Sequence, residues 1–188
     1  MTNARQPLDV VSLPSDLADF WGHYQTLPRD GLMPTLRAFL DSAPYRFMAR
    51  VAIADMMAPD DFVMRYYGTA LTELSGTDWT GISAKESARR GIPLQTGGRG
   101  WTAVKHPCGY LSTRAFVRRE RPFEPEVTFE VITLALPLSR PGQAAQCMVN
   151  YNSLPAIAAA QSAAAAKAVG QAITPLRWID IGAGIPQD

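Results

Sequence analysis

The chain has 188 residues, a length that fits one domain with extensions better than two. Hydrophobic residues make up 47% of it and charged residues 19%, values typical of a soluble globular protein that can build a core. The formal net charge is +1, so the composition does not suggest electrostatic capture of nucleic acid or of an acidic membrane.

Residues 1–14 are expected to form a loose N-terminal arm, and they lack the apolar segment of a signal peptide. No apolar run approaches the ~18 residues that a membrane span needs. Cys108 and Cys147 fit no zinc or redox pattern, and we expect them to be free buried thiols. These features together predict a cytoplasmic protein without nucleic-acid or membrane partners.

Two helices are expected after the arm. Ser15 can cap the first, and Pro34 suits the first turn of the second. The apolar stripes that they would bury consist of Leu17, Phe20, Trp21 and Tyr24 in the first helix and of Leu32, Leu36, Phe39 and Leu40 in the second.

Two strands at hairpin distance follow, over residues 45–57 and 62–68. Thr69 can cap a short helix after them, and a helical turn is expected near residues 84–90. A long regular helix beyond that turn would lose about 1 kcal/mol relative to alanine at each of its glycines. These glycines, which indicate a kink or a mobile lid instead, are Gly97, Gly98 and Gly100.

Three β patterns then occupy residues 109–119, 126–138 and 144–152, and antiparallel hairpins connect them most directly. The alanine-rich segment 153–173 predicts a helix capped by Ser153, which would dock on the domain or on a partner, and the tail after it is expected to be irregular. The order of elements predicts an α+β fold with a five-stranded antiparallel sheet. A helical insert between strands two and three would cover one face of that sheet, and the N-terminal helices would cover the other.

The stretch Asp61–Gly81 reads DFVMRYYGTALTELSGTDWTG and resembles the signature D-F-x-x-R-x-x-G-T … G-x-D-x-T-G of an alphaproteobacterial PAS subfamily, the PAS_5 type. The segment LALPLSRPG is similar to the hairpin motif L-x-L-P-L-x-x-x-G of the same family. The residues that carry the main match are Asp61, Phe62, Arg65, Gly68, Thr69, Gly76, Asp78, Thr80 and Gly81. The resemblance implies a PAS domain over residues 15–155, with the C-terminal helix and tail over 156–188.

The resemblance also implies a ligand pocket on one face of the second strand. Strand alternation would place Val63, Arg65 and Tyr67 in this pocket. It would place Phe62, Met64 and Tyr66 under the N-terminal helices. Arg65 would bind an anionic group of the ligand, or it would form an internal ion pair with Asp78 or Glu73; both interpretations stay open. The expected ligand-binding residues are Val63, Arg65, Tyr67, Asp78, Trp79, Trp101 and Arg114.

A PAS resemblance implies a non-catalytic sensor or interaction module in signal transduction. It would bind a small molecule, such as an anionic metabolite, or a protein partner. It would form a homodimer and act on a separate signalling protein. No cofactor is expected, because the cysteine motif of flavin-binding PAS domains is missing and His106, followed by Pro107, is more typical of an element end than of a haem ligand.

Two other classes of protein stay open. One is a small-molecule enzyme on an α+β cone-like fold, which would need Asp78 and His106 as an acid–base pair. The other is a ligand-free structural adaptor. In such an adaptor Arg65 would be paired internally, and Trp79 and Trp101 would be packed solidly.

Overall fold

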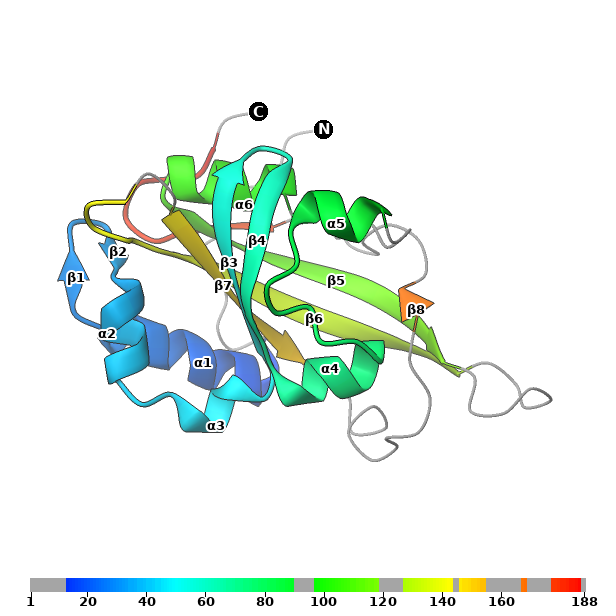
Figure 1. Ribbon diagram of the computed structural model, residues 1–188. Helices are drawn as coiled ribbons and strands as arrows, with labels where there is room; N and C mark the ends of the chain where they lie inside the picture. The colour runs from blue at the N-terminus through cyan, green and yellow to red at the C-terminus, as the bar shows by residue number, and fades with distance from the viewer. Residues whose placement is uncertain are drawn as a thin grey trace.

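The computed structural model describes residues 13–89, 97–118, 127–143, 146–154, 167–168 and 177–186. Within these residues one antiparallel sheet has the strand order β4-β3-β7-β6-β5-β8, and β9 also pairs with β5 (Figure 1). Its strands are β3 (Val51–Ala58), β4 (Asp61–Tyr67), β5 (Cys108–Arg118), β6 (Val127–Leu138), β7 (Gln146–Ser153), β8 (Lys167–Ala168) and β9 (Arg177–Asp180). The predicted α+β plan is confirmed, and two short strands extend the five long ones.

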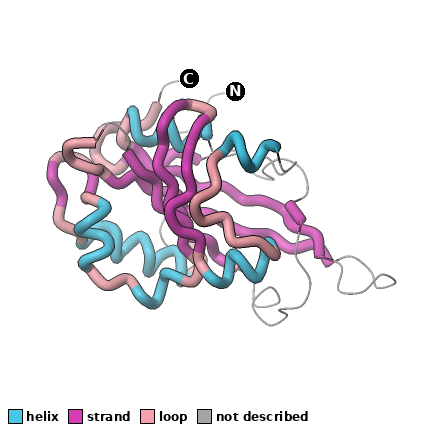
Figure 2. Tube along the Cα trace, in the orientation of Figure 1, coloured by secondary structure: helices cyan, strands magenta, loops and turns pink. Residues whose placement is uncertain are grey.

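Helices lie on both faces of this sheet (Figure 2). The helices are α1 (Ser15–Thr26), α2 (Leu36–Asp41), α3 (Tyr45–Met48), α4 (Thr69–Ser75), α5 (Ala84–Arg89) and α6 (Gly97–Lys105). We call the face covered by α4, α5 and α6 the insert face, and the face covered by α1, α2 and α3 the N-terminal-helix face. Each face carries its own apolar cluster, so the predicted coverage of both faces is confirmed. No described helix has the length and apolar character required to cross a membrane.

The first helix buries the stripe that its periodicity predicts. Phe20 is fully buried and stacks on the ring of Tyr151 with centroids 4.7 Å apart. The predicted cap is wrong: the helix is preceded by Pro14, and no side chain caps it. Asp16 instead ties the start of the helix to the sheet, because its carboxylate accepts hydrogen bonds from Arg50 and Ser153, both at 2.9 Å.

The second helix is shorter than predicted. It begins at Leu36, where Thr35 accepts a hydrogen bond from the backbone of the first turn, and Pro34 lies in the two-residue strand β2 (Met33–Pro34), which pairs with β1 (Arg29–Asp30). Leu32 and Leu40 are 45% and 47% exposed, so these two stripe positions are wrong. The predicted strand over 45–57 is wrong in its first part, because those residues form α3.

Two glycines explain how the helices of the insert approach the sheet. Gly68, not Thr69, stands at the cap position of α4, and a Cβ there would overlap the backbone carbonyl oxygens of Met48 and Ala49. The predicted kink near residue 100 is wrong, because α6 runs through all three glycines. A Cβ at Gly100 would lie 2.8 Å from Cε of Met56, so the glycine lets the helix lie close to the sheet.

The C-terminal residues differ from the prediction where they are described. Most of the alanine-rich segment, like residues 1–12, lies outside the described residues. Lys167–Ala168 form a strand against Val117 and Phe116 and not part of a helix. The tail is not irregular either, because β9 pairs with Cys108–Leu111 and so satisfies backbone groups at that edge of β5.

Candidate functional site

A β-bulge in β4 decides which side chains reach the insert face. Ile53 pairs with Tyr66 and Ala54 pairs with Met64, so Arg65 is an extra residue in the strand. Tyr67 packs in the apolar cluster of the insert face, and Tyr66 packs in that of the N-terminal-helix face. The predicted alternation is therefore wrong for Phe62 and Met64, which also lie on the insert face. An extra residue reverses the parity of every position beyond it.

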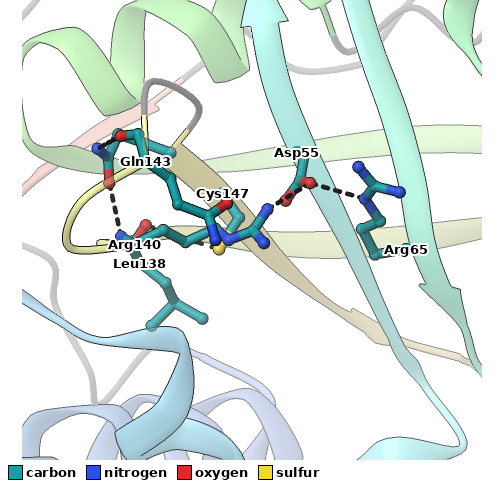
Figure 3. Close-up of polar contacts among 7 residues, drawn as sticks. Asp55, Arg65, Leu138, Arg140, Gln143 and Cys147 are labelled. Carbon is teal, nitrogen blue, oxygen red and sulfur yellow. Dashed lines mark hydrogen bonds and ion pairs between the residues drawn. The ribbon is translucent and has the colours of Figure 1, made fainter.

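Arg65 belongs to an ion-pair cluster that includes a buried carboxylate (Figure 3). Asp55 is 1% exposed. It lies two residues after Ile53 in β3, so its side chain is on the same N-terminal-helix face as that of Ile53. Its Oδ2 accepts a hydrogen bond from Nε of Arg65 at 2.6 Å and another from Nη1 of Arg140. The internal ion pair is thus present, but the predicted partners, Asp78 and Glu73, are wrong.

Asp78 has a local role in the turn after α4. It is exposed, and its Oδ1 accepts a hydrogen bond from the backbone of Thr80 at 2.9 Å, which lowers the pKa of the carboxyl. Nε2 of His106 is buried and has no partner within the described ranges. No hydrogen bond or ion pair between Asp78 and His106 occurs there, so the acid–base pair of the enzyme alternative is not formed.

Arg114 lies on the insert face. Alternation along β5 places it on the same face as Tyr110 and Phe116, and both of these pack in the apolar cluster under the helical insert. Burial of the guanidinium lowers the pKa of Arg114, and the charge of Arg99 on α6 lowers it further. Tyr110 and Tyr67 raise the pKa of Arg114, so both phenol groups lie close enough to interact with its guanidinium group. Within the described part of the chain, no carboxylate pairs with Arg114.

A row of paired residues crosses the insert face and reaches β5 at Tyr110, on the same face as Arg114. It runs from Tyr67 on β4 through Ala52, Asn150 and Ala135 to Tyr110 on β5. Both alanines are buried, and they leave only a methyl group on each side of the asparagine. Burial raises the pKa of Tyr110 to about 12 and also raises that of Tyr67, so both phenols keep their protons at neutral pH.

Asn150 is the polar centre of this row. The residue is 9% exposed, and its Oδ1 has no hydrogen-bond partner among the described residues. Buried polar atoms in folded proteins are nearly always hydrogen-bonded, so such an atom requires an explanation. We call Tyr67, Arg99, Tyr110, Arg114 and Asn150 the insert-face cluster.

Four of the seven residues predicted to bind a ligand lie together on the insert face; they are Tyr67, Trp79, Trp101 and Arg114. Trp79 is 2% exposed, as the adaptor alternative requires, whereas Trp101 is only partly buried, with Nζ of Lys105 4.6 Å from its ring centroid. Val63 forms a bridge with Ser83 at the edge of the sheet.

Sequence reasoning missed Arg99, Tyr110 and Asn150. Alternation along β5 would have placed Tyr110 on the same face as Arg114, and an asparagine within the apolar run of β7 marks an unusual polar position. The row itself had no sequence signal, because it joins five strands.

The chemistry of the insert-face cluster favours binding of an anion. Two guanidinium groups, two neutral phenols and one amide can hold a carboxylate or a similar group by hydrogen bonds. Cys108 packs on the same face, but burial raises its thiol pKa to about 12, which makes it a poor nucleophile. No three His, Cys, Asp or Glu side chains gather into a metal site within the described residues.

Comparisons with models of protein families, with curated proteins and with solved structures found no match for this chain.

Proposed function

We propose that the chain is a non-catalytic sensor module that binds a small organic anion between the sheet and the helical insert. Arg114 would contact the anionic group. The observation that carries this proposal is a guanidinium group on the insert face whose pKa is lowered by burial and which has no carboxylate partner among the described residues. A partly buried guanidinium group is stabilised by a counter-ion, and a bound carboxylate would supply one through charge-assisted hydrogen bonds.

The surroundings of Arg114 support the same proposal. Arg99 adds a second positive charge from α6, so the site attracts an anion from two elements at once. The two neutral phenols can donate hydrogen bonds to the same group. A ligand held in this way would join the helix α6 to strands β4 and β5.

The fold is compatible with the PAS-type sensor that the sequence motif suggests. Across the sheet the five long strands lie in the order β4-β3-β7-β6-β5. Along the chain the helical insert lies between β4 and β5, which are the second and third of these strands. In the proposed mechanism, occupancy of the site changes how α6 packs on the sheet. The N-terminal helices on the opposite face would pass this change to a second copy of the chain or to a separate signalling protein.

Native mass spectrometry of the freshly purified protein tests this function. We expect an additional mass that is lost on denaturation and that is absent from the variant Arg114→Met. The matched control is Arg37→Met, because the side chain of Arg37 is 89% exposed on α2 and should not affect the ligand. Retention of the ligand by Arg114→Met would contradict the proposal. So would a wild-type protein that carries no additional mass and shows no thermal stabilisation by small carboxylic acids.

A further inference from the structure

We infer that the ligand is a hydroxy acid whose carboxylate binds Arg114 and whose hydroxyl group binds the side-chain amide of Asn150. This inference rests on the proposed binding of an anion at the insert face. It adds a second point of recognition, at the other end of the ligand, and names Asn150 as a specificity-determining residue.

The contrast between two neighbouring asparagines of β7 carries the argument. Asn152 is satisfied, because its Oδ1 accepts a hydrogen bond from Thr133 at 2.8 Å and its Nδ2 donates to the backbone of Arg50 at 3.2 Å. Asn150 points to the same face two residues earlier and is more deeply buried, yet its Oδ1 has no partner within the described residues. The fold thus provides hydrogen bonds for the amide of Asn152, whereas Oδ1 of Asn150 is left without a partner among the described residues.

The environment of Asn150 selects a hydroxyl group. A side-chain amide presents an acceptor and a donor side by side, and a hydroxyl group can both donate and accept. Oδ1 of Asn150 requires a hydrogen-bond donor, which a hydroxyl group supplies and which an ionised carboxylate and a methyl group both lack. Ala52 and Ala135 border the asparagine in the row, so no long side chain of those strands stands beside it.

The register of the sheet sets how far apart the two recognition groups stand on the insert face. Arg114 pairs with Val131 and Asn150 pairs with Ala135 on the same strand, β6. With a rise of about 3.3 Å per residue and a strand spacing of about 4.8 Å, the two Cα atoms lie roughly 16 Å apart. Side chains stand roughly perpendicular to a sheet, so they do not close this distance by themselves, and a ligand that reaches both residues must be extended. A benzene ring that carries a carboxylate and a hydroxyl group at opposite ends is such a ligand.

Isothermal titration calorimetry with two probes of matched shape tests the inference. The probes are 4-hydroxybenzoate and 4-methylbenzoate, which differ only in a hydroxyl group and a methyl group. We expect wild-type protein to bind 4-hydroxybenzoate about tenfold more tightly, the size expected for one additional hydrogen bond. We expect Asn150→Leu to bind both probes with the same Kd. Asn150→Ala serves as a second variant if the leucine disturbs folding.

The outcomes separate this inference from the proposed function. Equal binding of both probes by wild type, lost in Arg114→Met, would overturn the role of Asn150 and leave the anion site standing. A preference for 4-hydroxybenzoate that survives in both Asn150 variants would also overturn it. Failure of wild type to bind either probe would count against both the inference and the proposed site.

Discussion

Arg65 donates a hydrogen bond from Nε to Oδ2 of Asp55 over 2.6 Å, and this contact ties the bulge of β4 to the buried carboxylate of β3. Arg140, which follows β6, donates to the same oxygen from the other side. One buried negative charge thus holds two arginines from separate parts of the chain. The arginine of the sequence motif therefore has a structural role at the bulge.

Removal of the shared charge should be more damaging than removal of either partner. We expect Asp55→Asn to lower the free energy of unfolding by about 1.5–3 kcal/mol, the range for hydrogen bonds to charged groups, because Arg65 and Arg140 lose their shared counter-ion. Arg65→Met should have a much smaller effect, since the side chain of Arg65 is 54% exposed and water can replace the contact. Urea unfolding of both variants measures the difference. Equal losses of stability would show that the cluster does not depend on its carboxylate.

Gly68 should not tolerate any side chain. A Cβ at this position would overlap two backbone carbonyl oxygens that cannot move independently. We expect Gly68→Ala to destabilise the fold by at least about 1–3 kcal/mol, the range for overpacked sites. Gly22→Ala is the matched control, because no atom lies within 4 Å of a Cβ there and alanine favours the interior of α1 by about 0.5–1 kcal/mol. Thermal unfolding should shift in opposite directions for the two variants; a similar shift in both would be inconsistent with the packing of α4 described above.

The pH dependence of stability should include a contribution from His23. Burial lowers the pKa of its ring below the usual 6.5, and the charge of Arg46 lowers it further. The unfolded chain therefore binds a proton more readily than the folded chain, so this contribution is complete above about pH 6.5 and is lost as the pH falls through that range. We expect the free energy of unfolding to fall more between about pH 7.5 and pH 5.5 in wild type than in His23→Gln. Parallel pH profiles for the two proteins would refute this role.

Both cysteines should resist alkylation in the folded protein. Burial raises the thiol pKa of Cys108 and of Cys147 to about 12, and the charges of Asp180 and Asp55 respectively contribute to this. Few thiolates are present near pH 8, and neither sulfur is accessible. Iodoacetamide should modify neither residue until denaturant is added, as measured by intact mass. Rapid labelling of one cysteine under native conditions would show that its surroundings open.

Periodicity predicted the parts of the fold whose burial follows from local spacing. The stripe of α1 and the five long strands have this property, because each places apolar residues at a regular interval. The phase of β4 could not be predicted, since a bulge at Arg65 leaves no mark in the spacing of apolar residues. The cap position of α4 depends likewise on a close approach to Met48 and Ala49, which precede β3 in the chain.

The site was predictable strand by strand but not as a whole. Arg114 and Tyr67 were both expected to face a ligand, and both lie on the insert face. The row that joins Tyr67 to Tyr110 through Asn150 depends on the register of five strands. Tertiary pairing sets that register, so spacing within any one strand does not reveal it.

The central claim, that an anion binds at the insert face, is tested most directly by nuclear magnetic resonance of 15N-labelled protein titrated with 4-hydroxybenzoate. We expect the largest shifts at Nε of Arg114, at the side-chain amide of Asn150 and along the row from Tyr67 to Tyr110. Arg50 and Arg65, which pair with Asp16 and Asp55, should remain unchanged. Shifts confined to these two arginines and the N-terminal helices, or no shifts at saturating concentrations of the acid, would contradict the claim.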